Sequence, residues 1–170
     1  MPRLLTRSSF LAGAAVAAIA PSAAFAAQPP DLDLANARLL VTVELLLVDF
    51  WSRAKLPIAK RAHFNEVEHL AAVSQILTGA GQTPATAADI DFTYPAKKKP
   101  AAIAVDLERM ALGAYLGAVD TTTSTDFRHV FSLVAASEAE HLSALHGFRN
   151  SFPEVLTIDQ ASDALSGYTS

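Results

Sequence analysis

The sequence contains no cysteine among its 170 residues. This absence excludes disulfides, thiolate metal sites, iron–sulfur clusters and cysteine nucleophiles, so a metal site in this chain would have to use oxygen and nitrogen ligands. Positive charge is also scarce, because 13 Lys and Arg residues stand against 17 Asp and Glu residues. The only basic cluster, at residues 97–99, is more typical of a solvated loop than of a binding patch. We therefore expect no nucleic-acid partner.

The N-terminal apolar run, residues 10–20, is too short to span a bilayer comfortably. Two arginines precede it and an Ala-Phe-Ala site follows it, an arrangement typical of a secretory signal peptide. We predict a signal peptide over residues 1–26, cleaved after Ala26, and one domain over residues 27–170. The mature chain is then exported to the periplasm or the extracellular space, without stable membrane insertion.

The export route stays open between Sec and an atypical twin-arginine signal, because Ser8 stands where the second arginine of the twin pair would be. An uncleaved membrane anchor is the alternative to cleavage. Removal of the signal leaves 11 basic and 17 acidic residues, a net charge of −6. This balance again disfavours nucleic acid as a partner.

The segment 127–148 combines an apolar helical face with two polar residues, Glu138 and His141. Steps of three and four place both on the face that would build a core, where a carboxylate without a partner costs several kcal/mol. A Glu three residues before a His on an inward face is a metal-ligand arrangement of four-helix carboxylate proteins. Taken alone, the motif also allows a solvated pair on the side of a helix. The face comprises Phe127, Phe131, Val134, Glu138, His141, Leu145 and Phe148.

The same pattern occurs 72 residues earlier, where NEVEHLAAV corresponds to SEAEHLSAL. Around Glu66 and His69 the face is otherwise apolar, with the same steps of three and four. An internal duplication is the simplest explanation of the shared E-x-E-H-L-x-A. The face comprises Ala62, Glu66, His69, Val73 and Ile76.

Two further segments each place one acid, Glu44 or Glu108, in a similar apolar face. The four predicted helices thus supply Glu, Glu-x-x-His, Glu and Glu-x-x-His in chain order, the ligand inventory of a dinuclear iron or manganese site in a ferritin-like bundle. The two faces are Leu40, Glu44, Leu47 and Trp51, and Val105, Glu108, Leu112, Tyr115 and Val119. The predicted metal ligands are Glu44, Glu66, His69, Glu108, Glu138 and His141.

These motifs, together with DIDFTYP and LERMALGAYLG, resemble the ferritin-like domain proteins, a group that includes plant desiccation-related proteins and many exported bacterial proteins. The resemblance covers the chain from about Asp31 to the C-terminus. It departs from the family in the first helix, where VELLLVDFW retains only Glu44 and Asp49 as acids.

The predicted fold class is all-α, a ferritin-like four-helix bundle with one long crossover between the second and third helices and a short C-terminal helix. Residues 82–100 lack periodicity and are long enough to run from one end of the bundle to the other. The first two helices, and the last two, are then antiparallel pairs. The predicted spans are residues 34–54, 58–77, 101–119, the stretch from the 120–126 turn to about 149, and a short helix that begins at Thr157.

Several local signals support these boundaries. Asp31 or Asp33 is expected to cap the first helix, and the Gly-Ala-Gly at 79–81 predicts a left-handed stop to the second. Gly113 and Gly117, four residues apart, predict the close approach of another helix.

Pro100 suits the start of the third helix, and the polar turn at 120–126 is expected to cap the fourth. Residues 39–50 are apolar nearly all round, which predicts burial on more than one side. We assign the second side to a homodimer contact, with a central helix in a monomer as the alternative.

In the predicted centre, the two Glu-x-x-His glutamates bridge two divalent ions, and each histidine supplies a neutral nitrogen. Glu44 and Glu108 each cap one ion. Carboxylate-rich ligation suits iron or manganese, and the chemistry implied is redox. Tyr115 lies seven residues after Glu108 on the same face, where it either bonds a ligand or is a core tyrosine with a satisfied hydroxyl. The remaining histidines, His63, His129 and His146, are not assigned as ligands.

The leading hypothesis is an exported ferritin-like protein with a dinuclear iron or manganese centre that reacts with dioxygen or peroxide. Whether it turns over as an oxidoreductase stays open. A non-catalytic stress-protective or binding module with the same bundle is the alternative. A cage-forming iron store is a third possibility, but no acid-rich outer face supports it.

Overall fold

The computed structural model describes residues 29–145 and 152–169, and the predicted signal peptide, Phe148 and His146 lie outside these residues. The described part is helical, with a single isolated β-bridge between Phe92 and Thr169 in place of any strand. The helices are α1 (Asp31–Arg53), α2 (Ala59–Gly79), α3 (Pro100–Thr121), α4 (Thr125–Ala144) and α5 (Ile158–Ser166).

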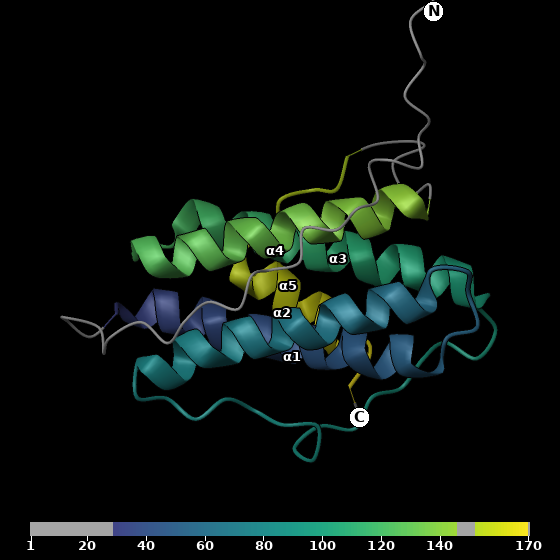
Figure 1. Cartoon of the computed structure of the whole chain (residues 1–170), viewed down its shortest axis with the longest axis horizontal. Helices are drawn as coiled ribbons and strands as arrows, with labels where there is room; N and C mark the ends of the chain where they lie inside the picture. The colour runs from purple at the N-terminus through teal and green to yellow at the C-terminus, as the bar shows by residue number, and fades with distance from the viewer. Residues whose placement is uncertain (1–28, 146–151, 170) are drawn as a thin grey trace, which may run out of the picture.

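The four long helices form a bundle of two antiparallel pairs, α1 with α2 and α3 with α4 (Figure 1). Short turns join the members of each pair, whereas the connection from α2 to α3 runs the length of the bundle. The predicted all-α class, pairing and crossover are therefore confirmed. The fourth helix was predicted to reach residue 149, but its described part ends at Ala144, and residues 146–149 are outside the described range.

The helix ends follow several of the predicted signals. Gly81 adopts a φ of 73°, and the N–H groups of Gly81 and Gln82 donate to the carbonyls of Thr78 and Leu77, which is a Schellman stop to α2. Pro100 is the first residue of α3, where its missing N–H costs nothing. The Ser124 hydroxyl accepts from the Phe127 N–H and caps α4.

Neither Asp31 nor Asp33 caps α1, so this prediction is wrong. The N-cap of α1 is Pro30, without a side-chain cap, and Asp33 is fully buried. Its carboxylate instead accepts from the backbone N–H groups of Thr123, at 3.0 Å, and Ser124, at 2.7 Å. The start of α1 therefore holds the turn between α3 and α4, since a buried carboxylate is stable only with such donors.

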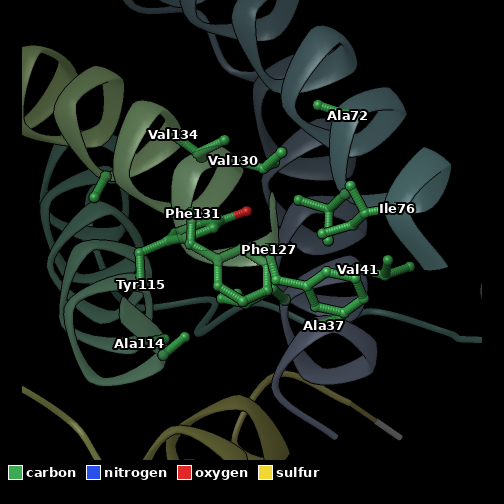
Figure 2. Packing of buried hydrophobic residues seen from close by; sticks show 14 of the residues in the cluster. Ala37, Val41, Ala72, Ile76, Ala114, Tyr115, Phe127, Val130, Phe131 and Val134 are labelled. Atoms are coloured by element: carbon green, nitrogen blue, oxygen red, sulfur yellow. The ribbon is translucent and has the colours of Figure 1, made fainter. Parts of the chain in front are cut away.

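The core runs along the centre of the bundle and includes most of α1. Helices α2, α3 and α5 all pack against α1, which confirms that it is buried on more than one side. Towards the end where α4 begins, Phe131 lies edge-on between Phe127 and Tyr115, with ring centroids 6.0 and 6.1 Å away (Figure 2). The buried apolar residues of α1 between 39 and 50 are Leu40, Val41, Val43, Leu45, Leu46, Leu47 and Phe50.

The crossover is fastened to the bundle by Tyr94, from the DIDFTYP segment. Its hydroxyl donates to the carboxylate of Asp49 at 2.7 Å, and its ring lies 5.6 Å from that of Phe50. The backbone N–H of Thr93 also donates to the carbonyl of Tyr168, beside the Phe92–Thr169 bridge. The C-terminal end of the chain therefore holds the crossover in place.

Gly113 and Gly117 do allow a close approach, but the partner is the non-helical segment before α5 and not another helix. A Cβ on Gly117 would lie 1.8 Å from the carbonyl oxygen of Leu156, and one on Gly113 would lie 2.5 Å from that of Glu154. The Leu156 N–H donates to the Gly113 carbonyl at 3.0 Å. This contact leads the chain into α5, whose predicted start at Thr157 is confirmed by a capping box with Gln160.

Gly117→Ala is expected to destabilise the protein by about 1–3 kcal/mol, or roughly 2–12 °C in Tm, because the clash is with backbone and the segment before α5 has to move. Thermal unfolding followed by circular dichroism measures the change. Gly167→Ala is the control, since its φ of −67° suits any residue and its added Cβ would lie 3.4 Å from the Ala164 carbonyl oxygen. Equal Tm values for the two variants would contradict the close contact.

Candidate metal centre

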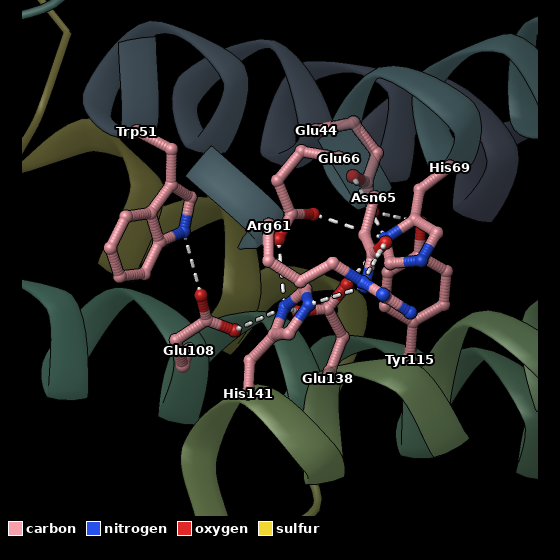
Figure 3. A network of polar contacts seen from close by, with 10 residues as sticks. All are labelled: Glu44, Trp51, Arg61, Asn65, Glu66, His69, Glu108, Tyr115, Glu138 and His141. Atoms are coloured by element: carbon pink, nitrogen blue, oxygen red, sulfur yellow. Dashed lines mark hydrogen bonds and ion pairs between the residues drawn. The ribbon is translucent and has the colours of Figure 1, made fainter. Parts of the chain in front are cut away.

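All six residues predicted as metal ligands meet in the middle of the bundle (Figure 3). Each long helix directs its acids or histidines inward because the neighbouring positions of the same face are apolar core residues. The four carboxylate residues are fully buried, and His69 and His141 are 1% and 5% exposed. The contributors are Glu44 of α1, Glu66 and His69 of α2, Glu108 of α3, and Glu138 and His141 of α4.

The residues form two overlapping groups, in each of which one ligand atom per residue lies within 4.8 Å of every other. Glu66 and Glu138 belong to both groups, which is the position expected of bridging carboxylates. The first group is Glu44, Glu66, His69 and Glu138, and the second is Glu66, Glu108, Glu138 and His141.

The two Glu-x-x-His motifs interlock across the bundle. The Nδ1 atom of His69 lies 2.9 Å from Glu138 Oε1 on α4, and the Nδ1 atom of His141 lies 2.9 Å from Glu66 Oε1 on α2. His69 Nδ1 is also 3.0 Å from Glu66 Oε2 of its own motif. Both imidazoles therefore turn the same nitrogen, Nδ1, towards the carboxylates.

Several of these buried atoms have ion-pair contacts within the cluster but no well-formed hydrogen bond among the described residues. A buried polar atom without a partner costs about 1–3 kcal/mol, so a cluster of them needs an explanation. Carboxylate oxygens and an imidazole nitrogen that converge on one space are suitable ligands for iron or manganese, and the residues present fit such ions. The atoms are Glu44 Oε2, Glu66 Oε1, Glu108 Oε2, both Glu138 carboxylate oxygens and His141 Nδ1.

Without metal, protons bound to carboxylates and imidazoles of the cluster offset its negative charge. Burial, followed by the charge of Glu138, raises the pKa of Glu44 and of Glu108 well above the usual range. Burial alone would lower the pKa of His69 and His141, but the neighbouring carboxylates raise it well above normal. Burial would also raise the pKa of Glu138, yet the two imidazoles hold it below its usual range. A metal would therefore replace protons at this site.

Each of the two outer carboxylates accepts a hydrogen bond from the opposite helix pair. The Tyr115 hydroxyl of α3 donates to Glu44 Oε1 on α1, so Tyr115 contacts a predicted ligand as well as the core. The Trp51 indole N–H of α1 donates to Glu108 Oε1 on α3 at 2.8 Å. These donors fix which oxygen of each carboxylate is left free to face the cluster.

Two contact residues were not singled out by the sequence pattern, Trp51 and Asn65. Trp51 lies seven residues after Glu44, the same spacing that separates Tyr115 from Glu108, and this parallel was a signal for its role. Asn65 Nδ2 lies 2.9 Å from His141 Nε2.

Of the remaining histidines, His63 and His129 lie in the described part of the chain and outside both groups. His63 is half-buried and His129 is exposed. Neither belongs to a cluster of possible metal ligands in the described part of the chain.

A bundle with one long crossover and a buried, shared set of carboxylates and imidazoles defines a class of four-helix proteins able to hold metal in the core. The chain belongs to the ferritin-like domain family, whose model matches residues 18–151. A conserved hypothetical protein, rv2844, from Mycobacterium tuberculosis has a similar structure, with a TM-score of 0.53 and 18% identity over 67% of this chain and 85% of that chain. This likeness concerns the fold alone.

No curated protein matches the sequence. Within residues 29–145 and 152–169, no helix is long and apolar enough to cross a membrane.

Proposed function

We propose that this is an exported ferritin-like protein that holds two divalent ions, iron or manganese, and carries out redox chemistry with dioxygen or peroxide. The single observation that carries the proposal is the pair of overlapping ligand groups, which share Glu66 and Glu138. Two groups with common carboxylates suit two adjacent ions better than one.

The charges of the site support a pair of divalent ions. Four carboxylates carry −4 and two neutral imidazoles carry none, so two divalent ions balance the cluster inside a buried core. Glu44 and His69 would complete one position, and Glu108 and His141 the other. A carboxylate-rich set of this kind suits iron or manganese better than copper or structural zinc.

The chain's own residues position the ligands and exclude water. Tyr115 and Trp51 each hold one oxygen of an outer carboxylate, and the apolar faces around them keep bulk solvent out. Bound iron or manganese would supply the redox chemistry, passing electrons to dioxygen or peroxide and recovering them from ferrous iron or a second peroxide molecule.

The full burial of the four ligand carboxylates favours a small oxidant over a bulky organic substrate. A cavity of about 720 Å³ lies between α1, α2 and the crossover, and none of the six ligand residues lines it. The full burial of the carboxylates also favours the second candidate, a non-catalytic protein in which metal stabilises the core. Turnover separates the two candidates.

Metal analysis and an oxidation assay test the proposal. The mature chain, purified, stripped with chelator and reconstituted with Fe²⁺ or Mn²⁺, is expected to hold about two ions per chain and to accelerate peroxide removal or ferrous oxidation. Two ions without turnover would favour the non-catalytic candidate. Fewer than about one ion per chain would contradict both.

Export and homodimerisation through α1 remain predictions with separate tests. N-terminal sequencing of exported protein should begin at Ala27, and full-length chain in the cytoplasm would contradict cleavage. Most apolar residues of α1 between 39 and 50 are already buried within one chain, which favours the monomer alternative for its second side. Light scattering after size-exclusion chromatography measures the oligomeric state.

A further inference from the structure

Asn65 connects α2 to the histidine of α4 at the cluster. It is half-buried and directly precedes Glu66. Its side-chain Nδ2 lies 2.9 Å from His141 Nε2, and its Oδ1 accepts from Arg61 Nε at 3.2 Å. The imidazole of His141 is thus held at both nitrogens, with Nδ1 facing the carboxylates and Nε2 facing Asn65 (Figure 3).

The internal duplication provides a comparison within the same molecule. In the aligned NEVEHL and SEAEHL segments, Ser137 occupies the position that corresponds to Asn65. Ser137 is buried, at 3% exposure, but within the described residues no hydrogen bond joins its hydroxyl to His69. The two halves of the cluster therefore differ at this position, although their six predicted ligands correspond.

The chemistry of a ligand imidazole explains why the difference matters. A histidine that binds metal through Nδ1 carries its proton on Nε2 and usually donates it to a carboxylate, a carbonyl or water, which fixes the tautomer and the ring orientation. A 180° rotation of the Asn65 side-chain amide exchanges its oxygen and nitrogen without moving the helix. The amide oxygen can then accept the Nε2 proton of His141. Arg61 is exposed and can release the oxygen to solvent.

We propose that Asn65 is a positioning residue that orients His141 for metal binding, and that the ion position formed with Glu108 and His141 is the tighter of the two. The inference rests on the proposed dinuclear site. At the position formed with Glu44 and His69, no side-chain amide of the described residues bonds the imidazole. Metal binding there must therefore supply more of the free energy that orients the histidine.

Calorimetric titration of Mn²⁺ into the chelator-stripped, full mature chain tests the inference, with three variants. Asn65→Ala is expected to weaken one of the two binding steps, the tighter one, by about 10–100-fold, the cost typical of losing an outer hydrogen-bond partner. Asn65→Asp, which has the same length and an acceptor oxygen, is expected to restore affinity to at least the wild-type value. Ser137→Ala, the matched control from the other half, is expected to leave both steps unchanged.

The outcomes separate this inference from the proposed function. Wild type that binds no Mn²⁺ would overturn the dinuclear site itself. Wild type with two binding steps that Asn65→Ala leaves unchanged, or weakens equally, would overturn the positioning role alone, as would an Asn65→Asp variant as weak as Asn65→Ala. Metal-free melting curves check that each variant folds, so that a lost binding step reports on His141 and not on the bundle.

Discussion

Glu138→Ala is expected to abolish the binding of both ions, whereas His141→Ala is expected to weaken mainly one. Glu138 belongs to both ligand groups and His141 to only one. Removing the carboxylate takes away one negative charge that both positions share. Removing the imidazole takes a direct ligand from one position, and the loss there should exceed the roughly 10–100-fold cost of losing an outer-shell partner.

Equilibrium dialysis or titration with Mn²⁺ or anaerobic Fe²⁺ measures the number of ions and their affinities. Glu140→Ala is the matched control, because Glu140 is exposed on the same helix two residues after Glu138. It is expected to bind two ions like wild type. Binding of two ions by Glu138→Ala, with affinities equal to those of the control, would rule out a shared bridging carboxylate.

Removal of metal is expected to lower the thermal stability of the wild type. A ligand that binds only the native state at about 100 times its Kd stabilises it by about 2.7 kcal/mol, which corresponds to roughly 5–11 °C in Tm for each ion. The metal-free cluster also leaves several buried carboxylate oxygens with ion-pair contacts at most and no well-formed hydrogen bond among the described residues. The metal-loaded and chelator-stripped forms should therefore differ clearly in a melting experiment.

The difference in Tm between the metal-loaded and the chelator-stripped protein is expected to grow as the pH rises. Glu44 and Glu108 have a raised pKa in the metal-free fold, so the stability they contribute is present below their ordinary value of 4.5 and is lost as the pH rises through the raised value. Metal binding must also displace protons from these groups and from His69 and His141, which becomes easier at higher pH. Glu138, with its lowered pKa, loses its contribution only in strong acid.

Melting curves with and without Mn²⁺ across the acidic to neutral range measure this effect. Glu138→Ala is the control, since it should show little stabilisation by metal at any pH. If Mn²⁺ raises the Tm of the wild type equally at every pH, or raises the Tm of wild type and Glu138→Ala equally, then metal does not replace protons at this cluster.

The fold was predictable where a local pattern determined the structure. Helical periodicity predicted the four long helices, and the length of the connection at residues 82–100 predicted the crossover. The contacts of Asp33 and Gly117 were not predictable in the same way. Asp33 caps a turn 90 residues further along the chain, and Gly117 contacts a segment that has no periodic pattern.

The candidate site was predictable because each helix carries its ligands at helical spacing. A polar residue in an otherwise apolar face needs a partner, and four such faces in a four-helix chain direct their polar residues to one centre. Trp51 and Asn65 were harder to recognise. Trp51 contacts Glu108, 57 residues away in the sequence, and Asn65 contacts His141, 76 residues away. No local sequence feature distinguishes an indole or amide that makes such a contact from one that does not.

The reciprocal hydrogen bonds of Trp51 and Tyr115 bear on the ancestry of the bundle. Each helical hairpin contains one outer carboxylate, one Glu-x-x-His motif and, seven residues after the outer carboxylate, an aromatic donor for the carboxylate of the other hairpin. Two copies of either hairpin would thus hold every acid, imidazole and aromatic donor of the complete cluster. A homodimer of one ancestral hairpin has the composition required to bind the same pair of ions, and fusion of its gene to a second copy would then have allowed the two aromatic donors to diverge into Trp and Tyr.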